Sequence, residues 1–244
     1  MRIDIATTAT WRPELLEETL DSFFTNLFSS LNAEYRMVIN VDPVGSDEDQ
    51  CGEIKKVVSK YFKSFKINRT NKPSFPKAFR TVWSLCNAPL VFNLEEDWVL
   101  NYKLDFPKIL EIMENNVSLA HLRLSAFRST EGHIKCWNHF FPWNGEFFEC
   151  KREDIGSVGW CGHPSLNRIS FVKGALGRID PNFNPEKQIK GRFMGDFLIK
   201  WRFGIYSHQN HPALIKDIGR PWMAKNKWRK AGGNDQHFTM WEKV

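Results

Sequence analysis

The 244-residue sequence has no long apolar run, no internal repeat and no low-complexity segment, and its five cysteines form no CxxC pair. Without an apolar run of about 20 residues we expect no transmembrane segment. The first residues already alternate like a strand, so we also expect no signal peptide. An odd number of cysteines without paired spacing argues against a disulfide framework and a zinc site, and it favours reduced thiols in a cytoplasmic protein.

Aromatic residues and positive charge are abundant instead. The chain has 20 Phe and 10 Trp residues and a formal net charge of +6. These aromatics predict a large aromatic core and a surface on which a ligand can stack. The positive charge favours anionic partners such as nucleotide phosphates, nucleic acid or an anionic membrane surface. Much of the excess lies between Lys216 and Lys230, although such a run is also typical of a solvated face.

Strand-like and helix-like segments alternate through the first half of the chain. We predict strands at 2–10, 35–41, 65–68, 90–94 and 117–124, and helices at 13–31, 46–62, 76–86 and 104–115. This alternation predicts an α/β fold with a mostly parallel sheet and helices on both faces. In the less regular second half we expect strands at 134–137, 146–150 and within 205–218, and helices at 168–176 and 188–203. A polar, basic tail is expected from Gly219.

Three consecutive acids, Glu95, Glu96 and Asp97, follow the apolar run at 90–94. That run is typical of a strand buried on both faces. Adjacent carboxylates repel one another unless a cation balances them, and hard oxygen ligands suit Mg²⁺ or Mn²⁺. In an extended chain Glu95 and Asp97 would point one way and Glu96 the other. A plain polar loop after the strand is the alternative interpretation.

Polar residues also lie at the carboxyl ends of the other predicted strands: Thr7 to Thr10, Asp42 and Asn71. Ligands of parallel α/β sheets gather at the carboxyl ends of the strands. We therefore expect these residues and the three acids to converge on one cleft. For Asp42, which Pro43 follows, a turn is the plainer interpretation.

The order of these features resembles that of GT-A fold glycosyltransferases, in particular the family-2-like group of nucleotide-sugar transferases. The matching features are the first strand Ile3–Thr10, the step Trp11-Arg12-Pro13 before a helix, Asp42, Asn71 followed by Ala78, and the DXD-like acids Glu95-Glu96-Asp97. The match covers 1–99 well and 159–222 loosely. It implies one Rossmann-like GT-A domain with a mixed, mostly parallel sheet. In it, 1–100 would bind the nucleotide, 101–218 would form an irregular acceptor half, and 219–244 a basic tail.

The resemblance implies transfer of a sugar from a nucleotide-diphosphate sugar, with a UDP-sugar favoured, assisted by Mn²⁺ or Mg²⁺. Such an ion stabilises the leaving diphosphate as a Lewis acid. The implied metal ligands are Asp97 and Asp217, which stands where the family often has a His; His208 and His211 are nearby alternatives. The implied nucleotide-binding residues are Thr7, Thr8, Arg12, Asp42, Asn71, Lys77, Arg80 and Glu95.

An inverting reaction, which we slightly favour, needs a carboxylate to take the proton of the acceptor hydroxyl. The family often has a Glu-Asp pair opening a late helix, and Gly195-Asp196 stands in its place. Asp196 is therefore the candidate base, with Glu149 and Asp154 in reserve. In a retaining enzyme Asp196 would hold the acceptor instead.

The acceptor is open among glycans, glycoproteins, lipid-linked molecules and DNA. Trp160, His163 and Trp222 are the candidate acceptor-binding residues, whereas core or loop positions are their plainer interpretation. The basic, Trp-containing tail motivates a modified base in DNA, because Lys and Arg neutralise phosphates and Trp can stack on an extruded base. A third hypothesis is a non-catalytic nucleotide-binding module, because Glu95 and Glu96 replace the more usual Asp.

Overall fold

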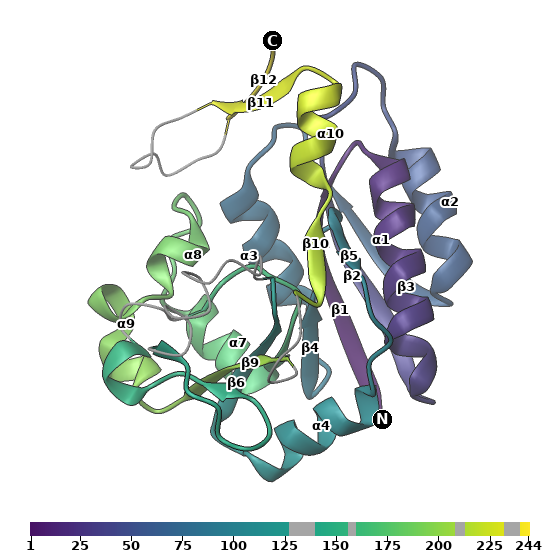
Figure 1. Ribbon diagram of the computed structural model, residues 1–244. Helices are drawn as coiled ribbons and strands as arrows, with labels where there is room; N and C mark the ends of the chain where they lie inside the picture. Colours follow the sequence, from purple (N-terminus) through teal and green to yellow (C-terminus); the bar gives the residue numbers. More distant parts are fainter. Residues whose placement is uncertain (127–139, 156–159, 208–212, 232–239) are drawn as a thin grey trace.

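The computed structural model describes residues 1–126, 140–155, 160–207, 213–231 and 240–244, and a mixed β-sheet forms its centre (Figure 1). Among those residues the sheet has eight strands in the order β3-β2-β1-β4-β8-β6-β9-β7. The strands are β1 (Arg2–Thr10), β2 (Glu34–Asp42), β3 (Ser64–Arg69), β4 (Leu90–Asn93), β6 (Leu119–Leu124), β7 (Phe148–Glu149), β8 (Ser165–Arg168) and β9 (Arg202–Tyr206). As predicted, β1, β2, β3 and β4 run parallel to one another. Strand β8 runs antiparallel between β4 and β6, so the sheet is mixed.

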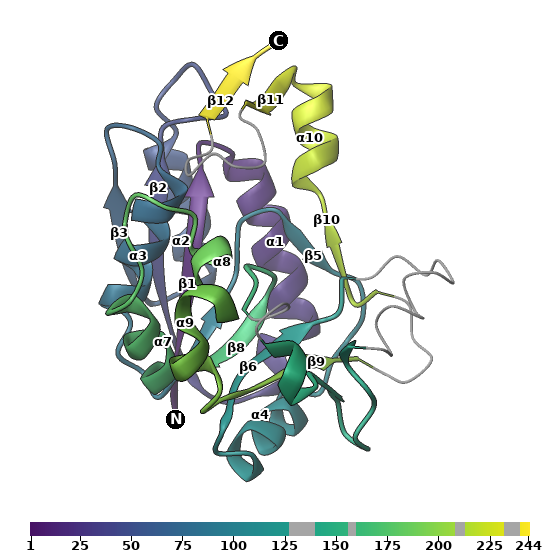
Figure 2. The ribbon, with the colours of Figure 1, turned by 90° about the vertical axis from the view of Figure 1, so that its left-hand side faces the viewer.

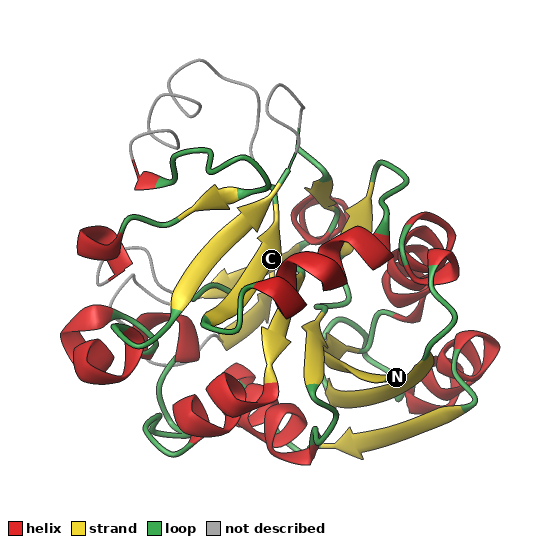
Figure 3. Ribbon diagram, turned by 90° about the horizontal axis from the view of Figure 1, so that it is seen from below, coloured by secondary structure: helices red, strands yellow, loops and turns green. Residues whose placement is uncertain are grey.

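Helices cover both faces of the sheet, as Figure 3 shows from below. One core contains side chains of α1 (Pro13–Asn26), α2 (Cys51–Tyr61) and α4 (Phe106–Asn115). The other contains side chains of α3 (Phe75–Leu85), α7 (Ile169–Leu176) and α9 (Gly191–Leu198). Shorter helical turns are η1 (Phe28–Ser30), η2 (Arg152–Asp154) and α8 (Pro185–Gln188).

Strand β4 lies between these two cores. Leu90 and Phe92 pack in the core of α1, and Val91 packs in the core of α3. All residues of β4 are buried, which confirms the prediction of a strand covered on both faces. The acids that follow are therefore held at the end of the most enclosed part of the sheet.

The described residues also form two small antiparallel sheets outside the central sheet. Strand β5 (Trp98–Leu100), directly after the acids, pairs with β10 (Ile215–Asp217). Helix α10 (Gly219–Lys225) and the pair β11 (Trp228–Ala231) and β12 (Met240–Lys243) come next. Trp222 Nε1–H donates to Glu14 Oε1 at 2.7 Å, so α10 contacts the start of α1 (Figure 2). The segment from Gly219, which we predicted as a polar, basic tail, contains α10 and the strand pair β11 and β12.

The predicted helix at 188–203 is confirmed only at 191–198. The chain forms α8, then α9, in which Met194 has non-helical dihedral angles, and then strand β9. The apolar spacing of 194–201 suits a helix, but 203–206 is a short run buried on both faces, which is typical of a strand. Gly204 allows close packing there, since a Cβ atom at Gly204 would lie 2.6 Å from the ring of Phe147. The predicted strand at 134–137 lies outside the described residues.

Within the described residues, no helix has both the length and the apolar character needed to cross a membrane. The cysteines that the structure describes, Cys51, Cys86, Cys150 and Cys161, are free thiols, in agreement with the prediction for them.

Candidate functional site

A cleft of about 180 Å³ opens where β1, β2 and β4 end. These are the carboxyl ends of parallel strands, where the sequence predicts that polar residues converge. The described residues that line it are Thr8, Ala9, Thr10, Arg12, Asp42, Pro73, Ser74, Phe75, Ala78, Glu95, Glu96, Asp97, Asn184 and Glu186. Five of these carry carboxylates and one carries a guanidinium, so the lining is acidic although the whole chain is basic.

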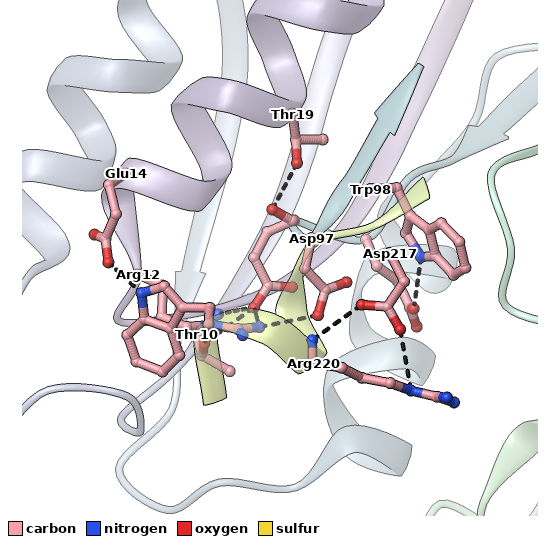
Figure 4. A network of polar contacts seen from close by, with 11 residues as sticks. Thr10, Arg12, Glu14, Thr19, Asp97, Trp98, Asp217 and Arg220 are labelled. Carbon is pink, nitrogen blue, oxygen red and sulfur yellow. Dashed lines mark hydrogen bonds and ion pairs between the residues drawn. The ribbon is translucent and has the colours of Figure 1, made fainter. Parts of the chain in front are cut away.

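Arg12 is the cation of this lining, and only 1% of its surface is exposed. Its Nη2 forms ion pairs with Glu96 and with Asp97 Oδ2, the latter at 3.2 Å (Figure 4). Its Nε–H donates to Thr10 Oγ1 at 2.7 Å. Burial by itself would lower the pKa of Arg12, but the two carboxylates outweigh burial and raise it. Arg12 is therefore a permanent positive charge fixed beneath the acids.

Glu96 is buried and points into this network. Its Oε1 accepts hydrogen bonds from the backbone N–H and the hydroxyl of Thr10, at 3.2 and 3.0 Å. Its backbone carbonyl accepts from Thr19 Oγ1 at 2.7 Å. The prediction that Glu96 points away from Glu95 and Asp97 is wrong, because the chain turns at Glu96 and Asp97 instead of staying extended. All three acids line the cleft.

Asp97 lies against the start of α10. The backbone N–H of Ile218 donates to the carbonyl of Asp97 at 2.9 Å. A Cβ atom at Gly219 would lie 2.7 Å from Asp97 Cγ and would overlap the carboxylate, so a larger residue here must displace Asp97 or α10. One turn later, the ring centroid of Trp222 lies 5.2 Å from the guanidinium carbon of Arg12. The C-terminal segment thus packs directly on the acid motif.

Asp42 binds the loop between β3 and α3, which also lines the cleft. It accepts hydrogen bonds from Thr70 Oγ1 at 2.6 Å, from Asn40 Nδ2 at 2.9 Å and from the backbone N–H of Ser74 at 2.8 Å. Burial raises the pKa of Asp42, even though these three donors oppose the shift. The contact with Ser74 fixes the start of α3 and places Phe75 at the cleft.

Glu186 and Glu95 both line the cleft, next to Gly162. Glu186 Oε1 accepts a hydrogen bond from the backbone N–H of Gly162 at 2.5 Å. A Cβ atom at Gly162 would lie 2.9 Å from Glu186 Oε1 and 3.2 Å from Glu95 Oε1, so both carboxylates converge on this glycine. Asn184 Oδ1 accepts from the N–H of Glu186 at 2.8 Å and caps α8.

Sequence reasoning missed Glu186. The run Asn184-Pro185-Glu186 is a helix-start signal, with a capping residue, a proline and an acid in order. That signal could have placed a helix here. It carries no information that brings Glu186 next to Glu95.

A second polar cluster consists of Arg123 and the two neighbours of Gly162 in the sequence, Cys161 and His163. Arg123 Nη1 donates to the sulfur of Cys161 at 2.8 Å. Burial would raise the pKa of Cys161, but Arg123 and His163 lower it well below its ordinary value. Burial would likewise lower the pKa of His163, and the neighbouring Cys161 raises it. The cluster therefore favours a thiolate beside an imidazolium.

The structure brings five of the predicted donor and metal residues to the cleft: Thr8, Arg12, Asp42, Glu95 and Asp97. Thr7 is fully buried, since neighbouring residues of a strand point to opposite faces. Asn71 and Lys77 are exposed and do not line the cleft. Arg80 donates to the carbonyls of Leu176 and Ile179, at 2.8 and 3.0 Å, away from the cleft.

The other predicted residues are placed as follows. Asp217 pairs with Arg220 at 3.1 Å and does not line the cleft, whereas Asp196 is exposed on α9. Glu149 is bound by Arg202, and Asp154 lies in η2, outside the lining.

Of the predicted acceptor-binding residues, Trp160 is a core residue, and His163 contacts Trp98 with ring centroids 4.9 Å apart. His208 and His211 lie outside the described residues.

No protein-family model and no curated protein sequence matches the chain. Solved structures do match its fold. The chain superposes on S. aureus TarS residues 1–349 with a TM-score of 0.61 and 12% identity, over 92% of this chain and 63% of that one. For the same TarS residues in complex with UDP-GlcNAc the TM-score is 0.58 at 14% identity, over 86% and 57%.

A mannosyltransferase, PcManGT from Pyrobaculum calidifontis, in complex with GDP-Man and Mn²⁺, matches with a TM-score of 0.54 and 9% identity, over 86% of this chain and 58% of that one. This chain has the GT-A fold. At these identities the likeness establishes the fold alone. The chain spans less than two thirds of the length of each of these structures.

Hard oxygen donors and an excess of carboxylates give the lining the character of a divalent-cation site. An anionic diphosphate would be repelled from such a lining unless a cation accompanied it. In the described parts of the chain, no three His, Cys, Asp or Glu side chains are already grouped as metal ligands. Asp97 would hold Mn²⁺ or Mg²⁺, with the remaining ligands coming from phosphate and water.

Proposed function

We propose that this chain is a glycosyltransferase that moves a sugar from a nucleotide-diphosphate sugar, with a UDP-sugar favoured, to an acceptor. The observation that carries the proposal is the cleft at the ends of β1, β2 and β4, where Arg12, Asp42 and the acid motif meet. In this fold, solved structures hold UDP-GlcNAc and GDP-Man.

The donor would lie along the cleft from Asp42 to Glu95. The ring of Phe75 would stack on the base, and Asp42 would accept a hydrogen bond from the base or the ribose. Both Phe75 and Asp42 line the cleft. Glu95 would bind the ribose or the donor sugar. Arg12 would hold Glu96 and Asp97 in place, because their charges would otherwise repel one another.

A bound divalent ion would supply Lewis-acid stabilisation of the departing diphosphate. In the transfer, the acceptor oxygen forms a bond to the anomeric carbon. The bond between that carbon and the phosphate oxygen breaks, and its electron pair leaves with the diphosphate. The fold around the cleft would exclude water and keep the donor aligned for this attack.

A modified base in DNA is the second candidate acceptor. Exposed basic residues lie on and near α10, beside the cleft: Lys216, Arg220, Lys225 and Lys227. Phosphate contacts by these residues would make duplex binding fall steeply with salt. A binding titration of duplex DNA at two salt concentrations tests this candidate, and absent or salt-insensitive binding removes it.

Purified protein incubated with Mn²⁺ and a panel of nucleotide sugars tests the transferase proposal. We expect slow hydrolysis of one donor, with water as acceptor, and loss of this activity in Asp97→Asn. A thermal-shift screen of the same donors gives a second readout, because a ligand of the folded state raises the melting temperature. Nucleotide binding without turnover of any donor would instead favour a non-catalytic binding module.

A further inference from the structure

The proposed transfer needs a group that takes the proton of the attacking hydroxyl if the reaction inverts the anomeric carbon. Such a group must lie in the cleft, on the side opposite the departing diphosphate. Among the described residues, the carboxylates in the lining belong to Asp42, Glu95, Glu96, Asp97 and Glu186.

Four of these five have other tasks. Glu96 and Asp97 are bound by Arg12. Asp42 is occupied by three hydrogen-bond donors that fix the loop before α3. Glu95 belongs to the donor-side motif, and Trp98 Nε1 lies 3.5 Å from its Oε2.

Glu186 differs in origin and in setting. It comes from α8 in the second half of the chain, so a segment other than the acid motif brings it to the cleft. Its Oε1 is fixed by the N–H of Gly162 at 2.5 Å, and the Asn184 cap fixes its backbone. A carboxylate held in this way keeps one orientation, as a general base requires.

Three acids outside the cleft are less suitable. Asp196 is exposed on α9 and does not line the cleft. Glu149 forms a two-point contact with Arg202, which lowers the pKa of Glu149 and weakens it as a base. Asp154 lies in η2, outside the lining.

We propose that Glu186 is the catalytic base, and that the acceptor hydroxyl binds between Glu186 and Glu95 over Gly162. The proposal rests on the transferase function proposed above. The acceptor O–H proton passes to the Glu186 carboxylate as the oxygen bonds to the anomeric carbon, and the diphosphate leaves with the electron pair of the broken bond. The sugar is transferred with inversion.

The test compares two isosteric substitutions, Glu186→Gln and Asp196→Asn, in the hydrolysis of the donor that the wild type turns over. The base also activates water, so the test does not need the natural acceptor. We expect Glu186→Gln to lower kcat by about 100-fold or more, and Asp196→Asn to stay within about twofold of the wild type. A melting curve checks that each variant is folded. Full activity of Glu186→Gln, or loss confined to Asp196→Asn, overturns the proposal.

Azide distinguishes a base from a structural carboxylate. Azide carries no proton and needs no base, so it should restore turnover in Glu186→Ala by bonding directly to the anomeric carbon and forming a glycosyl azide of inverted configuration. Product analysis by NMR reads both the azide and the anomer. Absence of rescue in folded Glu186→Ala, or a product of retained configuration, overturns the assignment of Glu186. Absence of turnover in the wild type itself would instead overturn the transferase proposal.

Discussion

Gly219 and Asp97 are so close that a Cβ atom at Gly219 would lie 2.7 Å from Asp97 Cγ. This contact joins residues far apart in the sequence and fixes the acid motif against α10. A larger residue at 219 must displace either the carboxylate or the helix.

We expect Gly219→Ala to weaken nucleotide binding and to lower the melting temperature, because the new methyl group overlaps Asp97. Gly52→Ala is the matched control, since a Cβ atom at Gly52 in α2 would meet no atom within 4 Å. Alanine is the better helix former, so this control should stabilise the protein by about 0.5 to 1 kcal/mol. Calorimetric titration and melting curves measure both effects. Unchanged binding in Gly219→Ala would contradict the close packing.

Removing Arg12 should destabilise the fold strongly. Arg12→Gln leaves the carboxylates of Glu96 and Asp97 next to each other without their cation. Breaking a buried pair by removing one partner costs about 3 to 5 kcal/mol. Arg220→Gln breaks the exposed pair with Asp217 and should cost less than about 1 kcal/mol. Urea unfolding measures both variants, and equal losses would argue against the special role of Arg12.

Metal removal should weaken nucleotide binding. The lining carries five carboxylates and one guanidinium, so an anionic diphosphate needs an accompanying cation. We expect calorimetry to show binding of UDP in Mn²⁺ that falls by about tenfold or more in a chelator, a change of about 1.4 kcal/mol. Asp97→Asn should abolish this difference. Equal affinity with and without Mn²⁺ would rule out a metal at the diphosphate.

Acid should destabilise the protein through Asp4. Burial would raise the pKa of Asp4, but Arg36 and the backbone N–H groups of Ala88 and Asn87 outweigh it and lower that pKa below 3.8. The unfolded chain then binds a proton more readily, so the stabilisation is present above pH 3.8 and is lost as pH falls through the lower folded pKa. Asp4→Asn should flatten the acid limb of a stability curve, whereas Glu53→Gln, at an exposed pair, should not.

Cys161 should react faster than Cys51 with iodoacetamide near neutral pH. Both thiols are partly exposed. Arg123 and His163 overcome burial and lower the pKa of Cys161, whereas burial and Asp49 raise the pKa of Cys51. The thiolate is the reactive form. Mass spectrometry of the labelled peptides compares the rates, and Arg123→Gln should slow only Cys161. Equal rates at the two thiols would contradict the ion pair.

The first half of the fold could be predicted because its signals are local. Helix α1 follows Pro13, and Leu16, Leu20 and Phe23 recur at helical spacing and are buried. Strand β4 is a short apolar run, and it is buried on both faces. The antiparallel insertion of β8 could not be predicted, because strand order depends on contacts between segments far apart in sequence.

The site divides in the same way. Arg12, Asp42 and the acid motif meet in one cleft because each lies at or just after the end of a parallel strand, and the carboxyl ends of parallel strands lie at the same edge of the sheet. The turn that aims Glu96 at Arg12 leaves no periodic signal. Glu186 and Gly219 were missed because each acquires its importance only from a residue of another segment.

The packing of Trp222 and Gly219 on the acid motif also has a consequence for biosynthesis. Arg12 and Asp97 leave the ribosome long before α10 does. Strands β1, β2 and β4 can assemble around them before α10 packs on Asp97. A nascent chain that stalls before α10 would therefore hold the acids of the cleft without the segment that packs on Asp97.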